Sequence, residues 1–206
     1  MNSSKLIALD ADGVLLDYNL AYATAWQRAF GERPALRNPR AYWAMERWDV
    51  PQLGPALREQ FRAVFDVQFW STVPALAGAV DACHSLRAAG FELVCVSALQ
   101  PQYAKARLAN LRSHGFPIEQ VVATSNDANG SSPKACALAQ LQPVAFVDDY
   151  LPYFHGVPES IHKALVLREP HGSPNTGPAL AHIQSTHGNM ADFVDWWLDE
   201  HPLLRD

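Results

Sequence analysis

The sequence of 206 residues is poor in cysteine and lysine. Its three cysteines, Cys83, Cys95 and Cys136, are widely spaced and form no Cys-x-x-Cys pair, which argues against a disulfide framework or a zinc site and fits a reducing compartment. Only four lysines occur, and no run of basic residues is present. Because nucleic-acid binding relies on clustered positive charge, we expect no nucleic-acid partner.

Long apolar runs are also absent. No stretch reaches the roughly 20 apolar residues of a membrane-spanning helix, and the N-terminus shows no charged-then-apolar signal segment. We therefore expect a cytoplasmic protein with no membrane partner. The hydrophobic content of 49%, the charged content of 18% and the net charge of −5 are typical of a globular chain that buries one core, with room for a modest insertion.

Short, continuous apolar runs predict strands buried on both faces, at residues 6–9, 91–96, 121–123 and 144–147. Helical patterns separate them, at residues 75–89, 101–114 and 132–141. Further strands are expected at 164–167 and 181–184, and a closing helix at 189–200. Alternation of this kind predicts an α/β fold with a doubly wound, parallel, Rossmann-like sheet.

One segment interrupts the alternation. Residues 18–70 contain helical patterns broken by glycine and proline and no convincing strand. That is too long for a loop between a strand and a helix. We expect a small all-helical cap of residues 17–70, inserted after the first strand of a core formed by 1–16 and 71–206, and placed like a lid beside the sheet.

Polar residues of chemical interest stand where the predicted strands end or the helices begin. In isolation Ser97 fits a turn residue and Lys134 an ordinary exposed lysine, and the acids after the first strand also fit an Asp-rich turn. The adjacent acids Asp148 and Asp149, directly after a core strand, are harder to explain as a turn. The carboxyl ends of parallel strands open on one side of a sheet, so these groups can converge. The resulting cluster of acids, one lysine and one hydroxyl suits a divalent cation and a phosphoryl group, and consists of Asp10, Asp12, Ser97, Lys134, Asp148 and Asp149.

These motifs, in this order, resemble those of the haloacid dehalogenase superfamily in its helical-cap subclass. The run from Asp10 to Val14 is similar to the first motif, Asp-x-Asp-Gly-Thr/Val. Ser97 and Lys134 are similar to the second and third motifs, and Phe146-Val147-Asp148-Asp149 to the fourth in its double-Asp form. The resemblance spans nearly the whole chain, and four ordered motifs are far more specific than one.

The resemblance implies a role for each residue. Asp10 would be the nucleophile that forms an aspartyl-phosphate, and Asp12 the general acid and then the base. Ser97, Ala98 and Lys134 would bind the transferring phosphoryl group. Mg²⁺ would be held by a carboxylate oxygen of Asp10, the backbone carbonyl of Asp12, and Asp149 with Asp148 close by.

Branches of the superfamily are separated by single residues. A dehalogenase needs no acid at position 12, because a leaving halide takes no proton. Phosphonate cleavage in capped relatives uses a cap lysine, and residues 17–70 contain none. Mutases similar to β-phosphoglucomutase carry a histidine where this chain has Tyr22. The sequence thus predicts a Mg²⁺-dependent phosphatase, a hydrolase of a small phosphate monoester. A phosphomutase, a dehalogenase-type hydrolase and a non-catalytic domain of the same fold remain as alternatives.

The cap is expected to select the substrate through one or two of its many arginines and aromatic residues, most of which would otherwise serve the cap's own core and surface. Two departures from the family pattern concern the phosphate pocket. Ala98 follows Ser97 where a small polar residue is common, and Tyr150 and Pro152 follow the double acid. The histidines of the last third, interpreted as surface or loop residues, are His155, His162, His171, His182 and His187.

Overall fold

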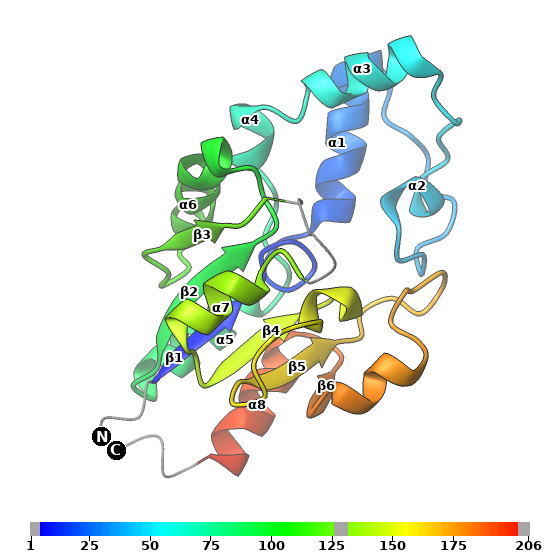
Figure 1. Ribbon diagram of the computed structural model, residues 1–206. Coiled ribbons are helices and arrows are strands. Elements are labelled where there is room, and N and C mark those ends of the chain that lie inside the picture. Colours follow the sequence, from blue (N-terminus) through cyan, green and yellow to red (C-terminus); the bar gives the residue numbers. More distant parts are fainter. Residues whose placement is uncertain (1–4, 126–131, 202–206) are drawn as a thin grey trace.

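The computed structural model describes residues 5–125 and 132–201. Its centre is a six-stranded, wholly parallel sheet with the strand order β3-β2-β1-β4-β5-β6 (Figure 1). The strands are β1 (Leu6–Leu9), β2 (Glu92–Ser97), β3 (Val121–Ala123), β4 (Ala145–Asp148), β5 (His162–Val166) and β6 (Ser185–His187). The predicted doubly wound α/β sheet is confirmed.

Apolar side chains cover both faces of the sheet, as the continuous strand runs predict. On β1, Ile7 and Leu9 join a core cluster with helices α5 (Ala79–Ala88), α6 (Ala104–Ser113) and α8 (Met190–Glu200). Ala8 points the other way, into a second cluster with α7 (Ala135–Leu141) and the 3₁₀ helix η2 (Leu151–Phe154). This alternation follows from the two-residue period of a strand. Strand β1 lies inside the sheet, between β2 and β4, so its carboxyl end lies beside theirs.

Helix α5 starts later than the sequence pattern predicts. Leu76 donates its backbone N–H to Leu15, and Ala75 forms a β-bridge with Leu16, so these residues pair with the loop after β1. The helix then begins after Gly78, whose φ of 75° fits glycine. The helix predicted at residues 101–114 begins with a short 3₁₀ helix, η1 (Pro101–Tyr103), which leads directly into α6.

The strand expected at 181–184 is wrong. Residues 178–182 form the 3₁₀ helix η3 (Pro178–His182), which begins with a proline that fixes its own φ. The edge strand β6 follows it and pairs with β5. Its sequence, Ser-Thr-His, carries no apolar run, because an edge strand is only half covered. His162 and His187 consequently lie on strands, partly buried against α8, and their interpretation as surface or loop residues is also wrong.

Residues 17–70 contain four helices and, among these described residues, no strand. They are α1 (Tyr18–Phe30), α2 (Ala44–Arg47), α3 (Pro55–Ala63) and α4 (Val67–Trp70), grouped beyond the end of the sheet in Figure 1. Asp17 begins α1 by accepting a hydrogen bond from the Leu20 N–H at 2.8 Å. The division of the chain into a 17–70 cap and a core stays a prediction.

The segment around α2 is tied to the loop that follows β5. The Tyr42 N–H donates to the His171 carbonyl at 2.9 Å, and the His171 N–H donates to the Arg40 carbonyl at 3.1 Å. Arg47 and Glu169 form an ion pair at 2.8 Å. These contacts hold the α2 segment against the loop that follows the carboxyl end of β5. Among the described residues, no helix has the length and apolar character needed to cross a membrane.

Candidate active site

The loop that leaves β1 is a tight, buried turn. Asp10 donates its N–H to Val147 of β4 at 2.9 Å, which continues the sheet by one residue. Gly13 then has a φ of 94° and donates to Leu16 at 2.8 Å. A Cβ placed on Gly13 would lie 2.3 Å from Oδ2 of Asp149. The first motif thus needs glycine at this position both for its backbone conformation and for space.

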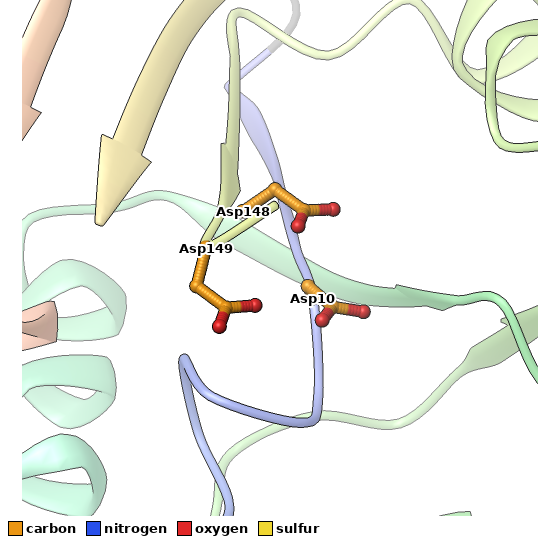
Figure 2. Close-up of side chains that lie close together, drawn as sticks. All are labelled: Asp10, Asp148 and Asp149. Carbon is orange, nitrogen blue, oxygen red and sulfur yellow. The ribbon is translucent and has the colours of Figure 1, made fainter. Parts of the chain in front are cut away.

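Three carboxylates meet at the carboxyl ends of β1 and β4. Figure 2 shows Asp10, Asp148 and Asp149 with their side chains gathered in one region. Each is buried, and each offers an oxygen within 4.8 Å of the others. Burial raises the pKa of Asp148 well above its ordinary value, against the opposing charge of Lys134. Such a group of desolvated acids requires nearby cations.

Lys134 supplies the first of these cations. Its Nζ lies 2.5 Å from Oδ1 of Asp10 and 2.6 Å from Oδ2 of Asp148, and the side chain has no exposed surface. Burial alone would lower the pKa of Lys134, but the two acids outweigh it and raise the value. Lys134 is therefore not the ordinary exposed lysine that its sequence position alone would suggest; it binds the nucleophile candidate Asp10 and fixes the orientation of that carboxylate.

Asp149 faces a cavity, whereas the carboxylate of Asp148 is occupied by protein hydrogen bonds. Both oxygens of Asp148 are engaged, since Oδ1 accepts the Tyr150 N–H at 2.9 Å and Oδ2 meets Lys134. Asp149 lines the cavity described below, and its Oδ2 accepts from Nε of Arg168 at 2.6 Å. Burial raises the pKa of Asp149, with Arg168 opposing. Asp149 is thus the better placed of the two to reach a ligand in the cavity.

Asp12 faces the same cavity but pairs with a different cation. Both of its carboxylate oxygens lie 2.8 Å from Nη2 of Arg107, and about a quarter of its side chain is exposed. Burial raises the pKa of Asp12 to about 6, and the charge of Arg107 opposes this shift. A carboxyl group with a pKa near neutrality can both donate and accept a proton, as a general acid–base residue must.

The donor set fits a hard divalent cation. Oxygen ligands from two or more carboxylates are what Mg²⁺ prefers, and the site supplies three within a short distance. Its four carboxylates meet three cationic side chains, which leaves one net negative charge when all are ionised. Asp10 and Asp149, which both line the cavity, would hold the ion, with Asp148 behind them.

A cavity of about 400 Å³ opens above the acids. Its walls combine catalytic candidates with aromatic rings from the cap segment and from the loop after β4. The residues that line it are Asp10, Asp12, Tyr18, Asn19, Tyr42, Trp43, Ala44, Trp70, Ser97, Ala98, Asp149, Tyr150, Tyr153 and Arg168. Ser97, at the end of β2, and Ala98 lie where the sequence predicts; Lys134 is not among the lining residues.

The aromatic residues of the predicted cap, from which we expect one or two to contact substrate, divide into two groups. Tyr18, Tyr42 and Trp43 line the cavity, whereas Tyr22 and Trp26 pack with Phe61 inside the helical segment. Trp48 is buried and donates its indole N–H to the Asn19 carbonyl at 2.7 Å. In the part of the chain that the structure describes, none of the arginines of residues 17–70 lines this cavity; they are Arg28, Arg33, Arg37, Arg40, Arg47, Arg58 and Arg62.

Sequence reasoning missed Arg107, Arg168 and the role of Tyr42. Tyr42 donates its hydroxyl to the Asp149 carbonyl at 3.2 Å, and its ring lies 4.6 Å below the guanidinium of Arg168. Arg168 follows β5 by two residues, so the rule that directed attention to other strand ends could have found it. Arg107 lies in the middle of α6 and carries no such signal.

No family model matches the sequence, and no curated protein matches it at a significant level. Solved structures do. A HAD family hydrolase from Deinococcus radiodurans, with bound phosphate and sodium, superposes with a TM-score of 0.65 at 18% identity, covering 95% of this chain and 96% of that one. A candidate β-phosphoglucomutase from Thermotoga maritima gives 0.61 at 17% identity, covering 94% and 98%. A dehalogenase gives 0.60 at 13%, covering 100% and 99%.

Proposed function

We propose that this chain, which has the fold of the haloacid dehalogenase superfamily, is a Mg²⁺-dependent phosphatase of a small phosphate monoester. The observation that carries the proposal is Asp12, an acid that lines the cavity beside Asp10 with a pKa raised to about 6 by burial. An alkoxide leaving group requires a proton donor, whereas a halide does not. The phosphate bound to the structural neighbour from Deinococcus radiodurans agrees with this choice.

The first step would be attack on phosphorus by Asp10. Lys134 binds Oδ1 of this carboxylate, which orients the group and leaves Oδ2 for the new bond. As the oxygen–phosphorus bond forms, the ester oxygen–phosphorus bond breaks, and Asp12 gives its proton to the departing alcohol. Ser97 and Ala98, at the end of β2, line the cavity where the phosphoryl oxygens would lie.

The second step would release phosphate. Asp12, now ionised, takes a proton from a water molecule, and that water's oxygen attacks the phosphorus of the aspartyl-phosphate. The Asp10 carboxylate is regenerated and inorganic phosphate leaves. A Mg²⁺ ion held by Asp10, the Asp12 backbone carbonyl and Asp149 would supply charge neutralisation for the phosphoryl group.

The cavity indicates what the substrate carries besides phosphate. Its volume of about 400 Å³ admits a small molecule. Aromatic walls from Tyr18, Trp43 and Trp70 favour a planar or apolar substituent over a highly charged one. The proposed partner is thus a small phosphorylated metabolite.

The test is a panel of phosphorylated sugars, nucleotides and acids together with 4-nitrophenyl phosphate, each assayed with Mg²⁺ and with a chelator. We expect turnover that depends on Mg²⁺ and that falls on the order of 10³-fold or more in Asp10→Asn. Asp81→Asn, an exposed acid in the first turn of α5, is the matched control and should keep full activity.

The alternatives are tested by adding a 2-haloacid to the panel and by identifying the products of each reaction. Halide release from a 2-haloacid would favour a dehalogenase, and conversion of a sugar phosphate to its positional isomer would favour a mutase. Absence of turnover in folded protein with Mg²⁺ present would leave the non-catalytic alternative and refute the phosphatase proposal.

A further inference from the structure

Arg107 is an arginine with no exposed surface, placed in the middle of helix α6. A buried guanidinium is costly unless an anion compensates it. Its Nη2 lies 2.8 Å from each carboxylate oxygen of Asp12, the candidate acid–base residue 95 positions earlier in the chain. The pairing therefore joins a core helix to the first motif.

No other anion competes for this arginine in the part of the chain that the structure describes. Its Nε and Nη1 have no hydrogen-bond partner there. Its guanidinium instead lies 5.0 Å from the ring of Trp70, an aromatic residue of α4 that lines the cavity. Arg107 itself is not a lining residue. It can act on a ligand only through Asp12 or through the position of Trp70.

Helix α6 is firmly anchored, so Arg107 is held in place. Asn110, three residues further along the helix, donates from Nδ2 to the Val73 carbonyl at 3.0 Å. The Nε2 of His114 lies 2.8 Å from the same carbonyl. Leu111 is fully buried in the core. A carboxylate bound to a rigid guanidinium is itself oriented, which is what a general acid requires.

We propose that Arg107 is a positioning residue that directs the Asp12 carboxyl toward the leaving-group oxygen of the substrate. The inference rests on the proposed phosphatase function. Without Arg107, Asp12 keeps its place in the chain but loses the contact that orients its carboxyl group. Proton delivery then suffers most for leaving groups that depend on it, while binding of the substrate is little affected.

The experiment compares two aromatic esters of similar size, 4-nitrophenyl phosphate and benzyl phosphate, in wild type, Arg107→Met and Arg107→Lys. Nitrophenolate leaves without a proton, whereas benzyl alcoholate does not. We expect kcat/KM of Arg107→Met to fall about 100-fold or more for benzyl phosphate and less than about tenfold for 4-nitrophenyl phosphate. KM should stay within about twofold. The Lys variant should recover part of the selective loss.

The choice of kcat/KM confines the measurement to formation of the phosphoenzyme, before the hydrolytic step that all substrates share. Adding Arg107→Met to an Asp12→Asn enzyme should cause no further selective loss, because the residue through which Arg107 acts is already disabled. Circular dichroism checks the fold of each variant. If Arg107→Met does not fold, the smaller selective loss expected in Arg107→Lys carries the comparison.

Either of two selectivity results overturns the inference alone: equal loss for both esters in an otherwise active enzyme, or a further selective loss when Arg107→Met is added to Asp12→Asn. A rise in KM with unchanged kcat would also overturn it, since it would make Arg107 a substrate-binding residue. Wild type that cleaves neither ester with Mg²⁺ would overturn the proposed function, and this inference with it.

Discussion

Gly13 and Asp149 approach each other so closely that the residue at position 13 determines whether the acidic cluster can assemble. A Cβ at Gly13 would lie 2.3 Å from Oδ2 of Asp149 and 2.8 Å from Nε of Arg168. Gly31, at the end of α1, has a similar φ of 86° but nothing within 4 Å of an added Cβ. Substitutions at these two glycines therefore distinguish the effect of backbone strain, which both share, from the effect of displacing Asp149, which only Gly13 would cause.

We predict that Gly13→Ala and Gly31→Ala each lower the free energy of unfolding by about 1–3 kcal/mol, because alanine is strained at positive φ. Only Gly13→Ala should also reduce kcat, by about 100-fold or more, since it moves Asp149. Chemical denaturation and steady-state kinetics measure the two effects. Wild-type kcat in Gly13→Ala would contradict the assigned role of this close contact.

Arg168 binds the carboxylate that a metal ion would use. Its Nε lies 2.6 Å from Oδ2 of Asp149, so the arginine and a cation compete for the same group. We predict that Arg168→Met increases the affinity for Mg²⁺ by about threefold to tenfold, or about 0.7–1.4 kcal/mol. Isothermal titration of the substrate-free protein with Mg²⁺ measures this.

Arg47→Met is the matched control for this titration. Arg47 pairs with Glu169, the residue after Arg168, and does not line the cavity that Asp149 faces. Its removal should leave Mg²⁺ affinity unchanged. Weaker Mg²⁺ binding in Arg168→Met would instead mean that the arginine holds Asp149 in the orientation that the ion needs.

The residues of the site show which parts of it the sequence could predict. Asp10, Ser97 and Asp149 follow or end core strands, so one topological rule places them all at the crevice. Arg107 escapes that rule because an arginine inside a helix pattern is ordinarily solvated. Its burial depends on how α6 packs against the first motif and Trp70, which is a tertiary contact that no local pattern encodes.

At the level of elements, the packing of β5 against α8 partly buries a polar side chain that the apolar pattern of the sequence did not place in the core. The ring of His162 on β5 lies 5.3 Å from those of Trp196 and Trp197, and its Nε2 lies 2.8 Å from Oγ of Ser185. Burial, together with the nearby His201 and His187, lowers the pKa of His162 from 6.5 to about 4. The side chain is neutral in the folded protein around pH 6.

This depressed pKa makes the folded state sensitive to acid. Between pH 6.5 and about 4 the unfolded chain binds a proton at position 162 that the folded protein does not, so the contribution to stability is present above pH 6.5 and is lost as the pH falls. We predict that Tm falls by a few degrees more in wild type than in His162→Gln between pH 7 and pH 4.5.

Thermal unfolding across that pH range measures the difference. His155→Gln, at an exposed histidine, is the control and should follow the wild-type curve. Parallel curves for wild type and His162→Gln would show that this histidine takes no part in the acid sensitivity of the fold.

On the scale of the whole molecule, the sheet brings together groups that lie far apart in the chain. Asp10 and Arg168 are separated by nearly the full core sequence, yet both line one cavity because β1, β4 and β5 are neighbours in a parallel sheet. Apolar runs and helix patterns predicted the strands of this core. They did not predict the edge strand β6, which depends on pairing with β5 and not on its own composition.

The same convergence makes ligand binding a property of the folded chain alone. The site combines residues from β1, β2 and β4 that lie far apart in the chain and meet only on folding, so Mg²⁺ with phosphate should stabilise the fold by about 2.7 kcal/mol at 100 times the dissociation constant. For a chain of this size we predict a rise in Tm of roughly 5–10 °C.

Asp149→Asn should lose most of the Mg²⁺-dependent part of this rise, because it removes a ligand that faces the cavity. The exposed Asp81→Asn should respond like wild type. Differential scanning fluorimetry with each ion alone and with both measures these shifts. An equal shift in Asp149→Asn and wild type would place the bound ion elsewhere on the protein.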